Sequence, residues 1–198
     1  MKALLALFVL VLSPNLSFAE AVVGQAAPAF KVKDASGKEQ SLQNYTGQWV
    51  VLEWYNKDCP FVKKHYGSGN MQSLQRSYGG NGVKWLTVIS SAPGKQGYLE
   101  PAQAEENAKQ VGSAAAAVLI DSTGAMGQAY GAKTTPHIFI IDPKGKLIYA
   151  GAIDDNSSAD PAVIPNSKNY VITTLDAAMA GKPVAVASSQ PYGCSVKY

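Results

Sequence analysis

The sequence is poor in arginine, in charged residues and in long apolar runs. Arg76 is the only arginine, and the other basic residues are lysines spread along the chain. No basic cluster is interleaved with aromatic residues, so nothing favours nucleic acid as a partner. Charged residues make up 16% and hydrophobic residues 46% of the chain, which indicates a soluble globular protein rather than a disordered one. After the N-terminal segment, no apolar stretch is long enough to span a bilayer.

Residues 1–19 have the pattern of a cleavable signal peptide. Lys2 gives a short positive start, residues 3–12 form an apolar run too short to cross a bilayer, and Ser17 and Ala19 place small residues where a signal peptidase requires them. An uncleaved anchor and a buried N-terminal helix are the alternatives. We expect cleavage, and therefore a secreted or periplasmic protein that makes no membrane contact after the signal is removed.

Cysteine is also scarce, since Cys59 and Cys194 are the only two. In an oxidising compartment, two cysteines are most simply one disulfide. Such a bond would join the first third of the chain to its C-terminal tail.

Alternating strand and helix patterns predict an α/β fold with a central mixed sheet covered by helices on both faces. The chain length suits one domain, which we place at residues 20–182, followed by an irregular tail at 183–198 that carries Cys194. The pattern predicts an N-terminal β-hairpin over 29–33 and 39–42 and strands at 49–55, 83–89 and 117–121. The turn residues Asp142-Pro143-Lys144-Gly145 join two further strands, 137–141 and 146–150, as an antiparallel hairpin. Helices are predicted at 61–78 (interrupted near Gly67 and Gly69), 101–111, 123–130 and 170–180.

Cys59 follows a buried strand and begins a helix, with Pro60 suited to the first helical position. A thiol at this place faces unpaired backbone N–H groups and the positive end of the helix dipole, and both stabilise the thiolate. Lys63 adds positive charge nearby. The thiolate is the nucleophile in disulfide exchange and in peroxide reduction, so Cys59 is the candidate reactive centre. An inert buried cysteine beside a strand is the alternative.

Thr135-Pro136 stands directly before a predicted strand, which is where a thioredoxin fold places its cis-proline loop. In that fold the loop lies against the cysteine at the helix N-terminus and presents backbone groups to a substrate. Thr135 and Pro136 are therefore expected to shape a substrate groove, with Asn56 and Trp54 beside it. An ordinary trans-proline at a strand start is the alternative.

The sequence resembles a peroxiredoxin-like (AhpC/TSA-type redoxin) subgroup of the thioredoxin superfamily. The resemblance covers nearly the whole chain after the signal and rests on these blocks: VLEWYNKDCPFVK at 51–63, AYGA at 129–132 leading to Thr135-Pro136, GAIDDN at 151–156, AGKPV at 180–184 and the ending GCSVKY at 193–198. It implies a thioredoxin fold with Cys59 as the nucleophile.

The sequence departs from this pattern at positions that matter for chemistry. Typical peroxiredoxins carry a Pro-x-x-x-Thr-x-x-Cys motif, and here Leu52 and Asn56 occupy the proline and threonine positions. They also carry a downstream arginine, and this chain has none after Arg76. Thioredoxins carry a second cysteine where this chain has Val62. A redox cycle would therefore require Cys194 as the resolving cysteine. Asn56 could donate a hydrogen bond near the sulfur.

Cys194 has two interpretations that the sequence leaves open. It is either the resolving half of a redox-active pair or half of a permanent bond that holds the tail down, which would stabilise the fold by about 2–4 kcal/mol.

His137 follows Pro136, so we expect it near Cys59, where it could lower the thiolate pKa or join the sulfur as a ligand for a soft metal. Copper chaperones of the same superfamily carry a second cysteine at the position of Lys63, which argues against copper. Asp154, Asp155 and Asn156 are too few for a calcium cage and are expected to form a solvated turn.

These patterns together predict an extracytoplasmic thiol-disulfide oxidoreductase or peroxiredoxin-like antioxidant protein. Cys59 would attack and Cys194 would resolve, and a dithiol or disulfide protein partner, or a thiol reductant, would exchange the electrons. No metal and no organic cofactor is implied. The alternative is a non-catalytic binding protein of the same fold, with Cu(I) as one candidate ligand, in which Cys59 and Cys194 form a structural disulfide.

Overall fold

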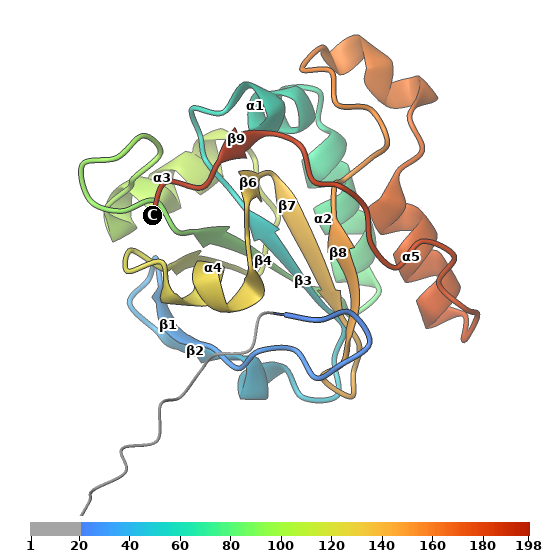
Figure 1. Ribbon diagram of the computed structural model, residues 1–198. Helices are drawn as coiled ribbons and strands as arrows, with labels where there is room; N and C mark the ends of the chain where they lie inside the picture. The colour runs from blue at the N-terminus through green and yellow to red at the C-terminus, as the bar shows by residue number, and fades with distance from the viewer. Residues whose placement is uncertain (1–20) are drawn as a thin grey trace, which may run out of the picture.

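The computed structural model describes residues 21–198, and the expected signal peptide lies outside this range (Figure 1). Seven strands form one sheet in the order β2-β1-β5-β4-β3-β7-β8. Strands β3, β4 and β5 run parallel, and the outer pairs are antiparallel, which confirms the predicted mixed sheet. The strands are β1 Lys31–Asp34, β2 Glu39–Ser41, β3 Val50–Trp54, β4 Lys84–Ile89, β5 Ala117–Ile120, β7 His137–Ile141 and β8 Leu147–Gly151.

Five α-helices and two 3-10 helices connect the strands of the described chain. Proline occupies the first helical turn of α1 and α3, where a missing N–H costs nothing, and Gly131 ends α4 in the left-handed conformation. No helix within residues 21–198 is long and apolar enough to cross a membrane. The helices are α1 Pro60–Gly67, α2 Asn70–Gly80, α3 Pro101–Gln110, α4 Ala125–Tyr130 and α5 Tyr170–Met179, and the 3-10 helices are η1 Leu42–Tyr45 and η2 Pro161–Asn166.

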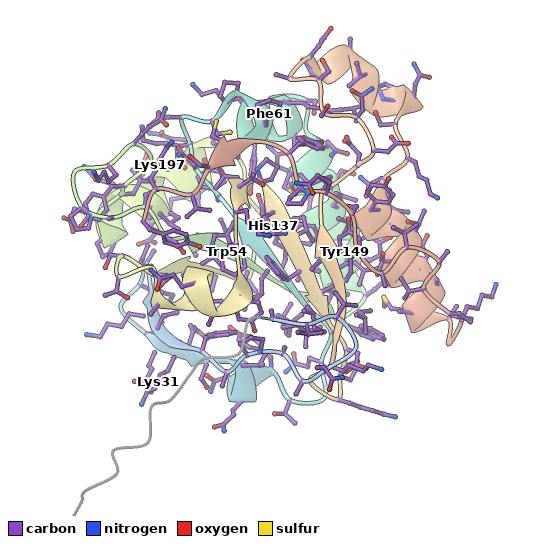
Figure 2. The ribbon with its side chains drawn as sticks, viewed as in Figure 1. Lys31, Trp54, Phe61, His137, Tyr149 and Lys197 are labelled. Carbon is purple, nitrogen blue, oxygen red and sulfur yellow. The ribbon has the colours of Figure 1, made fainter. Side chains whose placement is uncertain are left out.

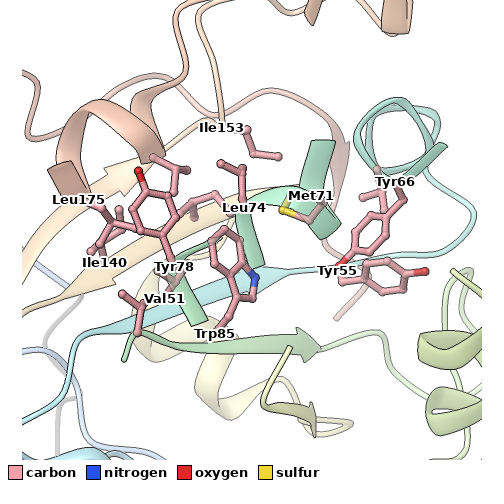
Figure 3. Close-up of a cluster of buried hydrophobic side chains, with 14 of the residues drawn as sticks. Val51, Tyr55, Tyr66, Met71, Leu74, Tyr78, Trp85, Ile140, Ile153 and Leu175 are labelled. Atoms are coloured by element: carbon pink, nitrogen blue, oxygen red, sulfur yellow. The ribbon is translucent and has the colours of Figure 1, made fainter. Parts of the chain in front are cut away.

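Two hydrophobic clusters lie on opposite faces of the sheet, because successive residues of β3 point to opposite sides. Val51 and Tyr55 pack on one face with Tyr66, Leu74 and Leu175 from the helices (Figure 3). Cys59 belongs to the same cluster. Leu52 and Trp54 pack on the other face against α4 and the N-terminal segment. Cys59 therefore belongs to a defined face of the sheet.

Both predicted hairpins are present. Strands β1 and β2 pair antiparallel, and so do β7 and β8. Between β7 and β8, the Asp142 carboxylate accepts from the backbone N–H groups of Lys144 and Lys146, as expected for a tight turn after a buried strand.

The C-terminal tail differs from the irregular segment that we expected. It crosses the edge of the molecule and adds a short strand, β9 Cys194–Ser195, to β6 Thr134–Thr135 (Figure 1). The tail therefore lies over the carboxyl end of β3, where α1 begins. The sequence did not reveal this pairing because a two-residue strand has no periodicity.

Candidate functional site

A strand, a tight turn and a helix place Cys59. The turn begins after β3, and the Cys59 N–H donates to the Asn56 carbonyl oxygen at 3.1 Å. Cys59 is the N-terminal cap of α1, with Pro60 as the first helical residue. Its extended backbone conformation directs the chain into the helix at the position that the sequence predicted, and its side chain makes no capping hydrogen bond to the first turn.

The Cys59 sulfur is buried, with 0% of the residue exposed. As a thiol it donates to the Thr135 carbonyl oxygen at 3.0 Å. Burial alone would raise the pKa of Cys59, but the neighbouring polar groups of Cys194, Val62 and Thr135 outweigh it and lower the pKa. The site therefore favours a thiolate at Cys59.

Cys194 lies directly opposite Thr135 in the β6–β9 pair. Both cysteines are free thiols, and Cys194 is partly exposed. Burial and the neighbouring Cys59 sulfur raise the pKa of Cys194 to about 11. The tail thus brings Cys194 beside the hydrophobic cluster that contains Cys59, and the two pKa shifts have opposite directions.

The loop before β7 forms the other wall of the site. The Thr135–Pro136 peptide bond is cis, as the position before a strand predicted. Thr135 is 3% exposed and its backbone pairs with the tail. Gly193 lies so close that a Cβ there would overlap the Thr135 carbonyl oxygen, which makes glycine necessary. The groove that we expected at Thr135 and Pro136 is filled by the tail.

Two residues assigned to this groove lie elsewhere. Trp54 is fully buried on the face opposite Cys59, where its ring packs against Phe139 and its Nε1 donates to Ser90 at 3.0 Å. Asn56 accepts from the Asp58 N–H at 2.9 Å, and its Nδ2 donates to the Gln96 carbonyl oxygen at 3.4 Å. The prediction that Asn56 donates to the sulfur is therefore wrong, because its side chain shapes the turn instead.

The two expected modulators do not act on the sulfur in this structure. His137 lies opposite Trp54 in the β3–β7 pair, on the same face of the sheet (Figure 2). Its ring lies 4.4 Å from that of Phe139, and its Nδ1 accepts from the Lys133 N–H at 3.2 Å. Burial lowers the pKa of His137 to about 3, so the ring is neutral. The expected approach of His137 to Cys59 is wrong, because alternation along β7 sends it to the other side of the sheet. Lys63 is exposed and lines a surface cavity of about 390 Å³.

A buried polar cluster beside the site escaped the sequence analysis. Lys64 and Asp154 are each 2% exposed and form an ion pair of 3.4 Å. Tyr192 donates to the Asp154 carboxylate and lies 3.0 Å from His65 Nε2. The solvated turn expected at 154–156 is wrong at Asp154, which is buried as the partner of Lys64. The only signal was positional, since Lys64 and His65 closely follow Cys59 and Tyr192 closely precedes Cys194 in the sequence, whereas Asp154 adjoins neither cysteine.

Within residues 21–198, no group of three or more histidine, cysteine, aspartate or glutamate side chains is arranged to hold a metal ion.

The mixed sheet, the cysteine at a helix N-terminus and the cis-proline loop define a protein with a thioredoxin-like fold. Comparison with protein families is more specific: residues 23–150 match the AhpC/TSA family, and the chain belongs to that family.

Known proteins of similar sequence or structure agree with this class. The chain is 29% identical over 125 residues to the thiol-disulfide oxidoreductase ResA of Geobacillus thermodenitrificans, covering 63% of this chain and 66% of that protein. A hypothetical protein of Sinorhizobium meliloti has a TM-score of 0.76 at 22% identity, covering 91% of this chain and 96% of that one. The thioredoxin domain of a thiol-disulfide oxidoreductase from Bacteroides vulgatus has a TM-score of 0.52 at 18% identity, covering 66% of this chain and 89% of that one.

Proposed function

We propose that this protein is a thiol-disulfide oxidoreductase in which Cys59 and Cys194 form the redox pair. Cys59 is the nucleophilic thiolate and Cys194 is the second sulfur of an intramolecular disulfide. A dithiol or disulfide protein, or a thiol reductant, exchanges two electrons with this pair. No organic cofactor takes part in this scheme.

One observation carries the proposal: the tail places Cys194 opposite Thr135, whose carbonyl oxygen accepts from the Cys59 thiol at 3.0 Å, with the pKa of Cys59 lowered and that of Cys194 raised. A stabilised thiolate beside a protonated thiol is the arrangement from which a disulfide forms when an oxidant removes two electrons. The similarity to a thiol-disulfide oxidoreductase supports the same chemistry.

Disulfide exchange suits the site better than rapid peroxide reduction. Leu52 and Asn56 replace the residues expected to assist peroxide, and both have other tasks here. Leu52 is fully buried in the core, and Asn56 holds the turn before Cys59. Peroxidase activity at a low rate remains part of the proposal, because the chain belongs to the AhpC/TSA family.

We infer that the protein acts outside the cytoplasm, secreted or periplasmic, as one redoxin domain over residues 20–182 with a tail at 183–198. The location rests on the pattern of residues 1–19, which the structure does not describe. It suits the proposed chemistry, because disulfides persist in oxidising compartments.

The test is redox titration of the purified protein in glutathione and dithiothreitol buffers, with mass spectrometry of the disulfide state. We expect a Cys59–Cys194 bond that opens at a potential above about −300 mV while the circular dichroism spectrum stays folded. Dithiothreitol-dependent reduction of insulin should proceed with the wild type and be lost in Cys59→Ser.

A parallel arm uses low peroxide, where sulfenylation of Cys59 followed by the Cys59–Cys194 bond would reveal peroxide reduction. A bond with a potential far below −300 mV would identify a structural staple and contradict the proposal. Inert thiols with stoichiometric Cu(I) uptake would favour the binding module.

A further inference from the structure

A cavity of about 200 Å³ lies behind the cis-proline loop, on the face of the sheet that carries Trp54. His137 and Phe139 of β7 line one side of it, and Lys133, in the segment between α4 and β6, lines another. Gln190, in the tail before Tyr192, lines the side opposite the sheet strands. The redox chemistry proposed above uses none of these side chains.

His137 is the buried hydrogen-bond donor of this cavity. The residue is 5% exposed, and its Nδ1 accepts from the Lys133 N–H at 3.2 Å. Because the ring is neutral and Nδ1 is an acceptor, the ring proton lies on Nε2. Within residues 21–198, this Nε2–H has no hydrogen-bond partner. A buried donor of this kind needs an acceptor in the cavity that it lines.

Lys133 supplies a positive charge at the same cavity. Burial first, and then the charge of Lys133, lower the pKa of His137, so the ammonium group is close enough to the ring to act on it. None of the residues that line the cavity is acidic. An anion in the cavity would therefore meet a cation and an N–H donor, and no lining carboxylate would repel it.

The two hydroxyl groups of the lining are already engaged elsewhere. Tyr130 donates to the Pro28 carbonyl oxygen at 2.7 Å. Ser189 Oγ accepts from the Ala152 N–H at 2.9 Å and lies 2.7 Å from the Tyr149 hydroxyl. The polar side chains left for a ligand are therefore donors or a cation, together with the exposed amide of Gln190.

We propose that this cavity binds a small organic monocarboxylate, with one carboxylate oxygen accepting from His137 Nε2–H and the other from the Lys133 ammonium. Charge-assisted hydrogen bonds of this type are among the strongest in proteins. One ammonium balances one negative charge, whereas a dianion would keep an uncompensated charge in a partly buried site. Apolar walls from Phe139 and Ala150 suit an organic body behind the carboxylate.

The site joins two segments that meet at Cys59 without using either sulfur. Lys133 and His137 flank the cis bond at Thr135–Pro136, and the Lys133 carbonyl oxygen accepts from the Val196 N–H of the tail at 3.0 Å. A bound carboxylate would lie between this loop and the tail segment that contains Gln190. The inference goes beyond the proposed redox function and does not depend on it.

The test is an NMR titration of the purified protein with propionate as the probe, at pH 7 and constant ionic strength. Long-range ¹H–¹⁵N correlations of the histidine rings follow His137, and the only other histidine, His65, serves as an internal control. We expect a saturable shift of His137 Nε2 and no shift at His65. The absence of a saturable shift at His137, as expected if the cavity holds only water, would overturn the proposal.

Two further probes test the chemical class of the ligand. Propionamide has the size of propionate but no charge, and we expect it to bind at least about tenfold more weakly because it cannot pair with Lys133. Inorganic phosphate should also bind more weakly than propionate. Equal affinity for propionamide, or tighter binding of phosphate, would contradict the assignment to a monocarboxylate.

Matched variants test the two ligand-binding groups by calorimetry. Lys133→Met removes the charge, and His137→Phe keeps a ring but removes the N–H donor. We expect each change to weaken propionate binding by roughly tenfold or more. Lys38→Met, which removes an exposed lysine in the β1–β2 turn, should bind like the wild type. Lys133 is itself exposed, so its variant remains informative even if His137→Phe fails to fold, and unchanged affinity in Lys133→Met would refute the site.

A cysteine variant separates this site from the proposed function. Because no sulfur contacts the ligand, Cys59→Ser should bind propionate with the affinity of the wild type while it loses insulin reduction. A protein without redox activity that still binds propionate at His137 would overturn the proposed function and leave this site intact. A redox-active protein without the His137 shift would overturn only the site.

Discussion

At the scale of single residues, burial sets the chemistry of the ionisable groups. Glu53 in the centre of β3 is fully buried, and one carboxylate oxygen accepts from Trp85 Nε1 at 2.7 Å and from the Tyr66 hydroxyl at 3.2 Å. The other oxygen has no hydrogen-bond partner. Burial raises the pKa of Glu53 to about 7, because the three donors, Gln75 among them, do not offset the loss of water.

We predict that Glu53→Gln flattens the dependence of stability on pH. A carboxyl whose folded pKa is raised favours folding while it is protonated, and this contribution is lost as pH rises from about 4.5 through about 7. Between pH 5 and pH 8, the wild type should lose about 2–3 kcal/mol more unfolding free energy than the variant. Urea unfolding at both pH values measures the difference, and parallel losses in the two proteins would refute the prediction.

At the scale of elements, the small β6–β9 pair decides where Cys194 lies. Gly193 has a φ of 138° and lies against the Thr135 carbonyl oxygen, so β9 can approach β6 only with glycine at this position. Gly181, just after α5, also has a positive φ, but the space around it is open. Both glycines therefore have a positive φ, but only at Gly193 would an added Cβ overlap a neighbouring atom.

Gly193→Ala should separate the tail from β6 while the rest of the sheet stays folded. We expect disulfide formation between Cys59 and Cys194 in a glutathione buffer to slow roughly tenfold or more, because about 1–3 kcal/mol of backbone strain opposes docking. Gly181→Ala is the control for a positive φ without crowding and should keep the wild-type rate. Equal rates for both variants would show that the close approach at Gly193 is unimportant.

At the scale of the whole molecule, one buried ion pair connects segments far apart in the sequence. Lys64 of α1 donates to the Asp154 carboxylate after β8 at 3.4 Å, to the Asn156 carbonyl oxygen at 2.8 Å and to Tyr192 of the tail at 3.3 Å. Because both charged side chains are out of water, each depends on the other.

Lys64→Met should therefore destabilise the protein strongly. It leaves the Asp154 carboxylate buried without its cation, which costs about 3–5 kcal/mol. Lys109→Met breaks an exposed pair with Glu105, whose side chains are 67% and 51% exposed, and should cost less than about 1 kcal/mol. Chemical unfolding of both variants at pH 7 measures the unfolding free energy that each one loses. Similar losses in the two variants would contradict the prediction.

Much of the architecture could be predicted from local pattern. The apolar run before Cys59 predicted β3, Pro60 predicted the start of α1, and the Asp142 turn predicted the β7–β8 hairpin. The cis bond at Thr135–Pro136 was also expected from its position. The peroxide chemistry, the signal peptide and the domain limits stay predictions.

The errors share one cause, which is that sequence gives proximity along the chain and not across the sheet. His137 and Trp54 adjoin the site in sequence, yet the strand alternation that buries both sends them to the opposite face. Asp154 looked like part of a solvated turn because its partner, Lys64, lies on another element.

The sequence by itself determined that Cys59 caps a helix after a buried strand, since both follow from local propensity and hydrophobic periodicity. Only the tertiary structure decided that Cys194 meets it. That contact depends on the hydrogen bonds that the tail makes from Tyr192 to the Asp154 carboxylate and from Tyr198 to the Ala132 carbonyl oxygen. It also depends on glycine at position 193, which permits the close approach to Thr135. These contacts join segments that are far apart in the sequence. They form only in the folded protein, so no local sequence pattern reveals them.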